Sequence, residues 1–264
     1  MSPKEAWASG DAYERYVGRW SRPVASRFID WLSVRGRARW LDVGCGTGAL
    51  TQTIRAHAEP REVIGIDPSP DFIDHARRSI IDDLVRFRVG NAMSLPFEDG
   101  SFDAVVCGLV LNFIPNQPQA LVEMYRVASA GAIVGAYVWD YAGRMELLRY
   151  FWDAAVALDP QARALDEGVR FPRCTAAGLE GAFRAAGFSD IATRAIDVPT
   201  VFRDFDDYWS PFLGGQGPAP GYTMSLSEVS RDALRDLIRS RLPFRSDGSI
   251  ELTARAWAVR GLRS

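Results

Sequence analysis

The chain is most constrained by a short segment, LDVGCGTGAL (Leu41–Leu50), in which three glycines alternate with other residues behind an apolar run. Glycine weakens both helices and strands, so three glycines within five residues indicate a backbone that something approaches closely. The preceding residues 39–43 predict a buried strand, and residues 49–58 predict a helix. A strand, a glycine turn and a helix N-terminus favour a site for a nucleotide-like ligand, because the helix start offers unpaired N–H groups.

The spacing of the glycines narrows the class of ligand. It is Gly-x-Gly-x-Gly, whereas dinucleotide-binding folds use Gly-x-Gly-x-x-Gly, and no Lys-Ser or Lys-Thr follows as in a P-loop. An acid about twenty residues further on, at a strand end, can accept hydrogen bonds from both ribose hydroxyls. Asp67, which follows the predicted strand 61–66, meets that requirement. A tight turn at the glycines and a helix cap at Asp67 are the alternative, but both features in this order favour a nucleoside site.

Strand and helix patterns alternate through the first half of the chain, which indicates a parallel sheet with helices on both faces. In the second half, segments 140–174 and 203–249 are interpreted as helical insertions on the same sheet, and residues 1–37 as an N-terminal helical cap. The predicted strands are residues 39–43, 61–66, 85–89, 102–107, 131–139, 191–202 and 250–259, and the predicted helices are residues 13–34, 49–58, 68–78, 117–128, 143–158, 175–187 and 227–241.

Charge and cysteine content limit the partners. The net charge of −2 gives no support for nucleic-acid binding, which usually requires a basic face. The three cysteines are irregularly spaced and predict neither a disulfide framework nor a metal site, which fits a reducing, cytoplasmic compartment. The N-terminal residues have no apolar core, so we expect no signal peptide, and no apolar run is long enough to cross a membrane.

Three motifs in this order resemble the class I S-adenosylmethionine-dependent methyltransferases: LDVGCGTGALT, VIGIDPSPDFIDHAR and RVGNAMSLPFEDGSFDAVVCGLVLNFIP. The resemblance covers residues 38–139 and is greatest to the small-molecule group that includes the ubiquinone and menaquinone C-methyltransferases. It implies one methyltransferase domain over residues 1–264, with S-adenosylmethionine as cofactor and a small-molecule acceptor. The implied fold is α/β, a Rossmann-like sheet of seven mostly parallel strands with the last antiparallel, which agrees with the strand count above.

The resemblance also implies where the cofactor is held. Gly44, Cys45 and Gly46 would line its methionine portion through backbone contacts. Asp67 would hold the ribose hydroxyls, and Pro68 would pack on the adenine.

Further cofactor contacts are implied after the next two strands. Ala92 and Met93 would cover the other adenine face, and Leu109 would lie near the amino acid end of the cofactor. Asn91 stands where the family usually has Asp, and its amide oxygen can still accept a hydrogen bond from the adenine amine. Asn112 stands where relatives often carry His, so no catalytic role of that His is carried over.

Candidate residues on the acceptor side are fewer, because methyl transfer needs mainly positioning and water exclusion. Asp140 and Tyr141 follow the fifth strand and are the candidate base and substrate contact, with a helix cap plus packing as the alternative. Arg19 is a candidate for the cofactor carboxylate, with an aromatic helix face packed on the sheet as the alternative.

Residues 205–222 combine aromatic side chains with a glycine-rich hinge. We expect a lid over an aromatic or apolar acceptor, and the alternative is a small hydrophobic core under a loop. Two other functions stay open: a nicotinamide-dependent dehydrogenase, which the glycine spacing disfavours, and a non-catalytic nucleoside-binding protein. The aromatic residues of this segment are Phe205, Tyr208, Trp209, Phe212 and Tyr222.

Overall fold

The computed structural model describes residues 18–214 and 217–264, which fall into two compact units. The first, called here the sheet unit, comprises Ser21–Trp139, Arg173–Ile196 and Ala256–Ser264. The second, called the aromatic unit, comprises Asp140–Pro172 and Asp197–Arg255, together with the described residues up to Trp20. Most of the two predicted insertions therefore lies in the aromatic unit.

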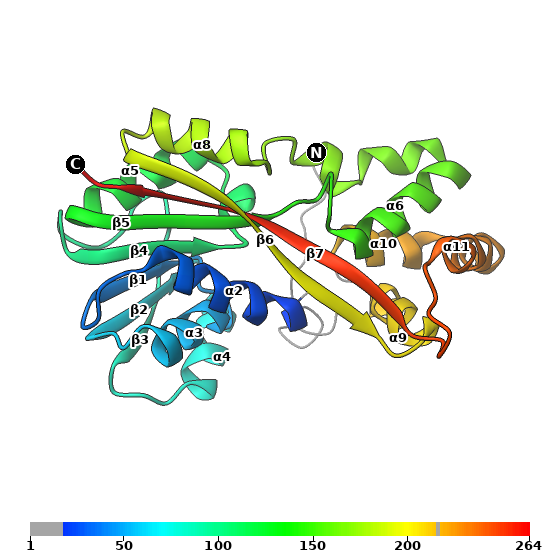
Figure 1. The fold of residues 1–264 in the computed structure, drawn as a ribbon, viewed down its shortest axis with the longest axis horizontal. Helices are drawn as coiled ribbons and strands as arrows, with labels where there is room; N and C mark the ends of the chain where they lie inside the picture. The colour runs from blue at the N-terminus through cyan, green and yellow to red at the C-terminus, as the bar shows by residue number, and fades with distance from the viewer. Residues whose placement is uncertain (1–17, 215–216) are drawn as a thin grey trace. The chain divides into compact units, whose positions relative to one another are not determined.

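A seven-stranded sheet has the order β3-β2-β1-β4-β5-β7-β6 (Figure 1). Strands β1 to β5 pair in parallel, and β7 pairs antiparallel with β5. This confirms the predicted fold class, including the antiparallel last strand. The strands are β1 (Arg39–Val43), β2 (Glu62–Asp67), β3 (Val85–Val89), β4 (Phe102–Gly108), β5 (Ala128–Trp139), β6 (Ser189–Phe202) and β7 (Ile250–Leu262).

Helices of the sheet unit lie on both faces of the sheet. Helices α5 and α8 lie together on one side, and α3 and α4 lie on the other, next to β2 and β3 (Figure 1). Side-chain caps mark several helix starts: at α4 the Ser69 hydroxyl accepts from Phe72 N at 3.3 Å. These helices are α2 (Arg19–Leu32), α3 (Ala49–His57), α4 (Pro70–Ser79), α5 (Gln117–Val127) and α8 (Ala176–Ala185), with the 3₁₀ helix η2 (Leu111–Phe113).

The aromatic unit is mainly helical, and it corrects the expectation of a glycine-rich hinge without regular structure within residues 205–222. Residues 159–174 contain two short helices, and Pro218, expected in a glycine-rich loop, begins a regular helix. Proline is compatible with a first helical turn because its missing N–H has no partner there. The elements are α6 (Glu146–Leu158), η3 (Pro160–Ala164), α7 (Glu167–Arg170), α9 (Phe205–Trp209), η4 (Ser210–Gly214), α10 (Pro218–Ser225) and α11 (Glu228–Arg241).

Close packing of α2 on the sheet depends on a glycine in β5. A Cβ at Gly135 would lie 2.9 Å from the Phe28 ring, 2.9 Å from the Leu32 side chain and 3.3 Å from the Val259 carbonyl oxygen. All of these residues are buried, so little space exists for relief.

We therefore expect Gly135→Ala to lower the free energy of unfolding by about 1–3 kcal/mol, measured by urea denaturation. Gly181→Ala is the matched control. Gly181 is an exposed residue inside α8, and a methyl group added there would meet no atom within 4 Å, so the change should stabilise by about 0.5–1 kcal/mol. Equal effects of the two substitutions would contradict this account.

Candidate functional site

The site lies where the strand order reverses, between the neighbouring strands β1 and β4. The chain continues from β1 to β2 on one side and from β4 to β5 on the other, so the loops after β1 and β4 diverge at this point. In open α/β sheets ligands bind at the carboxyl ends of strands at such a position. The glycine loop follows β1, and Leu109 and Asn112 follow β4.

Three glycines of the loop have positive φ, but for different reasons. The φ values are 73° at Gly44, 53° at Gly46 and 92° at Gly48. A Cβ at Gly44 would overlap the Val110 side chain, and one at Gly48 would lie 2.6 Å from Ile80. Only at Gly46 does a Cβ position have no atom within 4 Å. The expected close approach of a ligand therefore fits Gly46, whereas the other two glycines accommodate side chains of the protein.

Asp67 ties the loop after β1 to the end of β2. Its Oδ2 accepts from Gly46 N at 3.0 Å, and its Oδ1 accepts from Ser69 N at 2.9 Å. Burial raises the pKa of the Asp67 carboxyl, and the two backbone hydrogen bonds oppose that rise. Each carboxylate oxygen keeps a further lone pair, so Asp67 can still accept hydrogen bonds from a ligand.

Below the loop lies a second buried carboxyl that the sequence reasoning missed. Asp42 Oδ2 accepts from the Thr51 hydroxyl at 2.7 Å, whereas Asp42 Oδ1 has no hydrogen-bond partner among the described residues. Burial raises the pKa of Asp42 to about 7, and the nearby Asp67 adds to the rise. The signal was present in the sequence, because Asp42 interrupts the apolar residues Trp40, Leu41 and Val43 next to the glycines.

The Cys45 side chain points away from the loop surface and into the core with Ile73 and Phe87. Its thiol is buried, and its pKa is raised by burial. Any contact of Cys45 with a ligand would be made by its backbone, as expected. The first turn of α3 follows Gly48, which provides no side-chain cap.

Residues assigned to the adenine end lie after β2 and β3. Pro68 is exposed, directly after Asp67, and Ala92 and Met93 are half-buried. Asn91 Oδ1 accepts from Met93 N at 2.9 Å, so this amide shapes its own turn. These roles remain predictions.

The loop after β4 holds two unusual features. Leu109 has φ of 60°, a left-handed conformation that costs a non-glycine residue about 1 kcal/mol, and its N–H donates to the Tyr137 carbonyl oxygen at 2.8 Å. Asn112 has both amide atoms buried, and neither has a hydrogen-bond partner in the described chain. Val110, between them, fills the space above Gly44 and so connects this loop to the glycine loop.

Arg19 belongs to the aromatic unit, whereas the glycine loop belongs to the sheet unit. Its Nη1 donates to Asp207 Oδ1 at 3.2 Å, and its guanidinium lies 4.5 Å from the centre of the Trp20 ring and 4.6 Å from that of Phe202. Its Nε and Nη2 atoms are buried without a partner among residues 18–214 and 217–264. These two N–H groups form one edge that matches a carboxylate.

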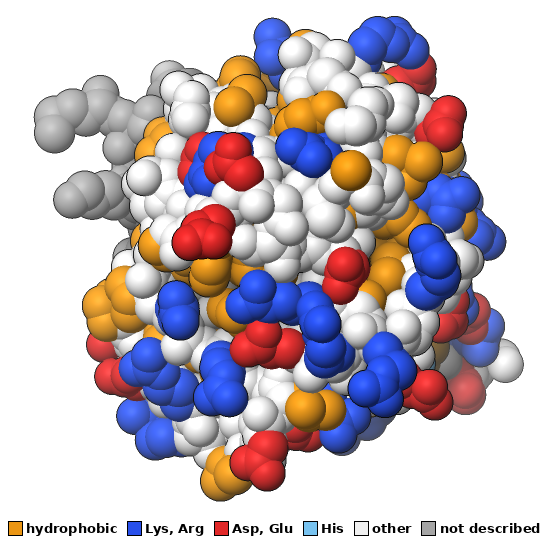
Figure 2. Space-filling view, turned by 90° about the vertical axis from the view of Figure 1, so that its left-hand side faces the viewer, with side chains coloured by type: hydrophobic (Ala, Val, Ile, Leu, Met, Phe, Trp, Pro, Cys, Tyr) orange, Lys and Arg blue, Asp and Glu red, His pale blue; other side chains and the backbone are white. Residues whose placement is uncertain are grey.

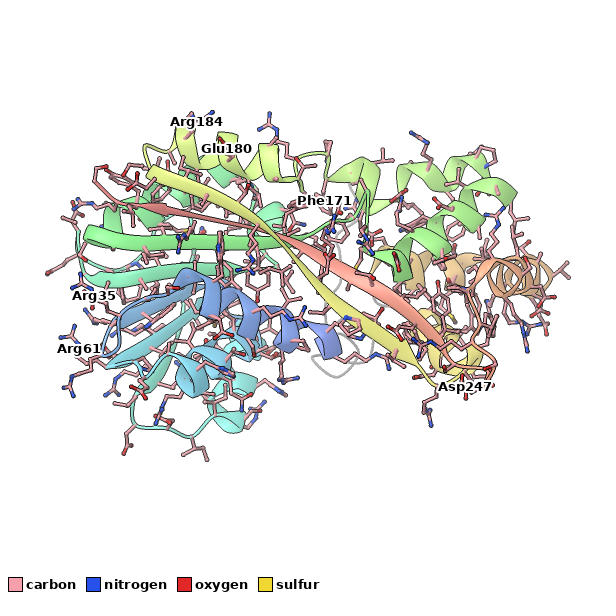
Figure 3. The ribbon with its side chains drawn as sticks, in the orientation of Figure 1. Arg35, Arg61, Phe171, Glu180, Arg184 and Asp247 are labelled. Atoms are coloured by element: carbon pink, nitrogen blue, oxygen red, sulfur yellow. The ribbon has the colours of Figure 1, made fainter. Side chains whose placement is uncertain are left out.

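Asp140 and Tyr141 also lie in the aromatic unit. Asp140 Oδ2 accepts from Arg144 N at 3.0 Å, which stabilises the turn before α6. The Tyr141 ring lies 5.6 Å from the Phe171 ring, labelled in Figure 3. These contacts match the alternative of capping and packing, and the catalytic and substrate roles remain predictions.

The five aromatic side chains expected in a lid are buried and pack on one another and on α6. Phe212 stacks on Phe151 with ring centres 4.5 Å apart, and the Tyr208 hydroxyl donates to the Leu147 carbonyl oxygen at 2.9 Å. They form the core of the aromatic unit, which is the arrangement expected of a small hydrophobic core. A lid function of this segment therefore rests on its loops and not on these rings.

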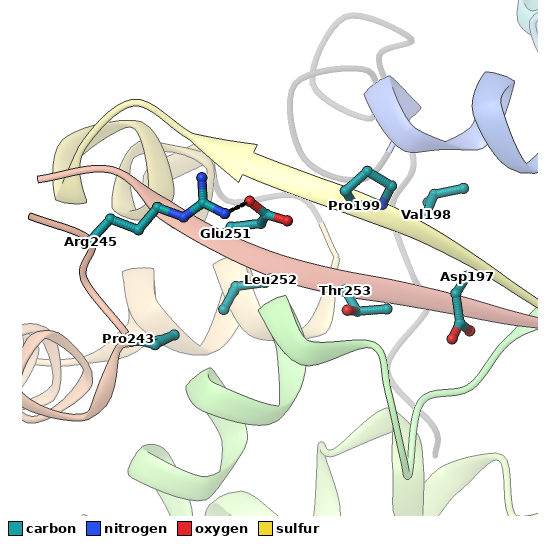
Figure 4. Close-up of a pocket in the computed structure, with 8 residues that line it drawn as sticks. All are labelled: Asp197, Val198, Pro199, Pro243, Arg245, Glu251, Leu252 and Thr253. Carbon is teal, nitrogen blue, oxygen red and sulfur yellow. Dashed lines mark hydrogen bonds and ion pairs between the residues drawn. The ribbon is translucent and has the colours of Figure 1, made fainter. Parts of the chain in front are cut away.

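A separate pocket of about 530 Å³ lies on the aromatic unit between β6, β7 and the segment before β7 (Figure 4). Its charged groups are paired within the protein: Arg245 with Glu251, and Asp197 with Arg255 at 2.6 Å.

Basic and acidic side chains are interspersed on the face drawn in Figure 2. Among the described residues no group of three or more His, Cys, Asp or Glu side chains could hold a metal ion, and no helix could span a membrane.

Comparison with known proteins identifies the family. Residues 41–135 match the family model for the methyltransferase domain. Human thiol S-methyltransferase TMT1A is 30% identical over 194 residues, which cover 71% of this chain and 75% of that protein. A demethylmenaquinone methyltransferase of Lactiplantibacillus plantarum is 40% identical over 106 residues, 38% of this chain and 45% of that enzyme.

Among solved structures, phosphoethanolamine N-methyltransferase 2 of Haemonchus contortus, bound to phosphomonomethylethanolamine and S-adenosylhomocysteine, matches with a TM-score of 0.56. It is 17% identical, and the match covers 96% of this chain and 56% of that one. The chain belongs to the class I S-adenosylmethionine-dependent methyltransferases. It spans about half the length of the demethylmenaquinone methyltransferases that it matches.

The buried Asp42 predicts a specific pH dependence of stability. Its pKa of about 7 lies above the ordinary value of 3.8, so the folded protein retains a proton that the unfolded chain releases. The free energy of unfolding therefore falls as pH rises from about 4 to 7. Asp42→Asn keeps an oxygen that can accept from Thr51 but has no proton to lose. Between pH 4 and 7 the free energy of unfolding of wild type should therefore fall by on the order of 3 kcal/mol more than that of Asp42→Asn.

Urea denaturation at pH 4.5 and 7.5 measures the effect. The exposed Asp71, in the first turn of α4, provides the control Asp71→Asn, which also removes one carboxylate. If Asp42→Asn and wild type lose stability in parallel across this range, Asp42 does not carry the proton.

Proposed function

We propose that the protein transfers a methyl group from S-adenosylmethionine to a small-molecule acceptor. The observation that carries the proposal is the open space at Gly46, whose N–H is bound by the Asp67 carboxylate at a strand end. Family membership and the S-adenosylhomocysteine bound in a structure of the same fold support it. Membership of this family does not favour the dehydrogenase alternative, and turnover separates the enzyme from a non-catalytic binding protein.

The residues present fit this cofactor. Gly46 offers bare backbone to its methionine portion, together with the backbones of Gly44 and Cys45. Asp67 offers two oxygens, held in place by backbone donors, to the two ribose hydroxyls. The unpartnered Asp42 Oδ1 lies on the strand that leads into the same loop and provides a further hydrogen-bonding atom, a donor when the carboxyl is protonated and an acceptor when it is ionised.

The remaining cofactor contacts follow the proposed orientation. Pro68, Ala92 and Met93 would pack on the adenine, and Asn91 would accept from its amine. Leu109, held in its left-handed conformation, would lie at the amino acid end of the cofactor. The free edge of Arg19 would bind the cofactor carboxylate.

When bound, S-adenosylmethionine supplies an electrophilic methyl group on a sulfonium. The protein's part is then to position the acceptor in line and to exclude water, and charge disperses as the methyl moves. A general base is required only for an acceptor that must lose a proton early, and Asp140 is the candidate, with Tyr141 as a substrate contact.

For the methyl acceptor we propose a chemical class and not a single compound. The named relatives act on a quinone precursor and on thiols, so small molecules of both kinds are candidate acceptors. We place the enzyme in the cytoplasm, consistent with three free cysteines, and expect no nucleic-acid partner at a net charge of −2. Loops of residues 140–174 and 203–249 are proposed to close over the acceptor.

Radiolabelled S-adenosylmethionine and a panel of quinols, phenols, thiols and amines provide the direct test of activity. Label should pass to at least one acceptor class, and S-adenosylhomocysteine should inhibit the transfer. Saturable binding without transfer to any acceptor would favour the non-catalytic alternative.

Asp67→Asn should weaken S-adenosylmethionine binding about 10- to 100-fold by isothermal titration calorimetry. The amide has one acceptor oxygen in place of two, and its NH₂ faces backbone donors, so one ribose hydroxyl loses its charge-assisted hydrogen bond. The control Asp71→Asn, in the first turn of the helix α4 that follows Asp67, should leave the affinity within about twofold. Unchanged affinity in a folded Asp67→Asn protein would refute the assignment of the site.

A further inference from the structure

Asn112, like Asp42, is a polar side chain at the switch point with buried atoms that lack hydrogen-bond partners, and in Asn112 both amide atoms are affected. It stands on η2 directly after β4, two residues from Val110, which contacts the glycine loop. Its Oδ1 and Nδ2 are both shielded from water and have no hydrogen-bond partner in the described part of the chain. Buried amides almost always have partners, because each unmade hydrogen bond costs about 1–3 kcal/mol.

We propose that the Asn112 amide recognises a neutral polar group of the methyl acceptor, a hydroxyl or a carboxamide. This inference rests on the proposed function, since it assigns a contact on the acceptor side of the same site. Asn112 lies on the loop after β4, whereas Gly46 and Asp67 hold the cofactor from the loops after β1 and β2.

The chemistry of the free amide defines the class of group. Asn112 offers one acceptor atom and one donor atom, so both are satisfied only by a group that donates and accepts. A carboxylate would leave Oδ1 unpaired, and an ammonium would leave Nδ2 unpaired. Asn112 has no ionisable proton, so its role is specificity and orientation, not proton removal.

The loop that carries Asn112 shows a second sign of a binding role. Leu109 has a positive φ, and its N–H donates to the Tyr137 carbonyl oxygen; such strain is retained where the surrounding structure requires it. The hydrogen bond from Ile114 N to the Leu111 carbonyl oxygen, which closes η2, is long at 3.4 Å. A small shift of this turn would uncover the amide for the acceptor.

Two asparagines of the same loop make a matched test of whether the amide is free. Asn116 Oδ1 caps α5 by accepting from Gln119 N at 3.2 Å, whereas Asn112 lacks such a bond. We expect Asn112→Leu to raise the midpoint of thermal unfolding by about 2–5 °C, because it removes an unsatisfied amide. Asn116→Leu should lower it by about 2–4 °C. A fall in the Asn112→Leu midpoint would overturn the proposal.

Binding and kinetics then identify what the amide contacts. Asn112→Leu should bind S-adenosylhomocysteine within threefold of wild type by calorimetry. With a hydroxyl- or carboxamide-bearing acceptor from the panel, its KM should rise about 10- to 100-fold. It should also lose the preference of wild type for that acceptor over the analogue in which the group is replaced by hydrogen.

Each other outcome has a distinct meaning. A tenfold or greater loss of S-adenosylhomocysteine affinity would assign Asn112 to the cofactor and overturn the proposal, as would an unchanged KM and preference. Failure of wild type to bind S-adenosylhomocysteine would instead defeat the proposed function, and the contrast between Asn112→Leu and Asn116→Leu would still report whether the amide is free.

Discussion

The site depends on the Asp67 carboxylate, which accepts one hydrogen bond from Gly46 N and another from Ser69 N. These two bonds join the loop after β1 to the start of α4, so the carboxylate that we propose as the ribose ligand also orders the backbone of the glycine loop. Burial raises the pKa of Asp67, and the backbone donors oppose that rise. The carboxylate is therefore a structural support, and under the proposed function it is also a binding group, so deletion alone cannot separate the two roles.

The middle of the sheet could be predicted from the sequence, because β1, β2 and β4 contain short apolar runs whose ends are marked by Gly44, Asp67 and Gly108. The glycine loop could be located but not explained in full. Of its three glycines only Gly46 faces open space, and the crowding at Gly44 comes from Val110, which is more than sixty residues away in the chain. Contacts between distant segments are invisible to local spacing, so the sequence cannot say which glycine meets a ligand.

The aromatic segment after β6 is a second case in which local sequence spacing does not reveal contacts with distant segments. Its spacing and apolar character are compatible with rings that line a lid and with rings that pack in a core. The structure buries Phe212 against Phe151 and places the Tyr208 hydroxyl on the Leu147 carbonyl oxygen. Since α6 precedes this segment by about fifty residues, only the tertiary fold decides between the two arrangements.

Two of the buried polar side chains that have atoms without hydrogen-bond partners lie at the switch point. Asp42 Oδ1 and the Asn112 amide are buried beside the loops after β1 and β4, and Leu109, in the second of these loops, holds a left-handed backbone of the kind that functional loops retain. A chain selected for stability alone would replace these groups with apolar ones, because an unsatisfied buried group lowers the free energy of unfolding. Under the proposed function, their position at the switch point, where β1 and β4 diverge, would let ligands complete the missing hydrogen bonds, and recognition would then come at a cost in stability.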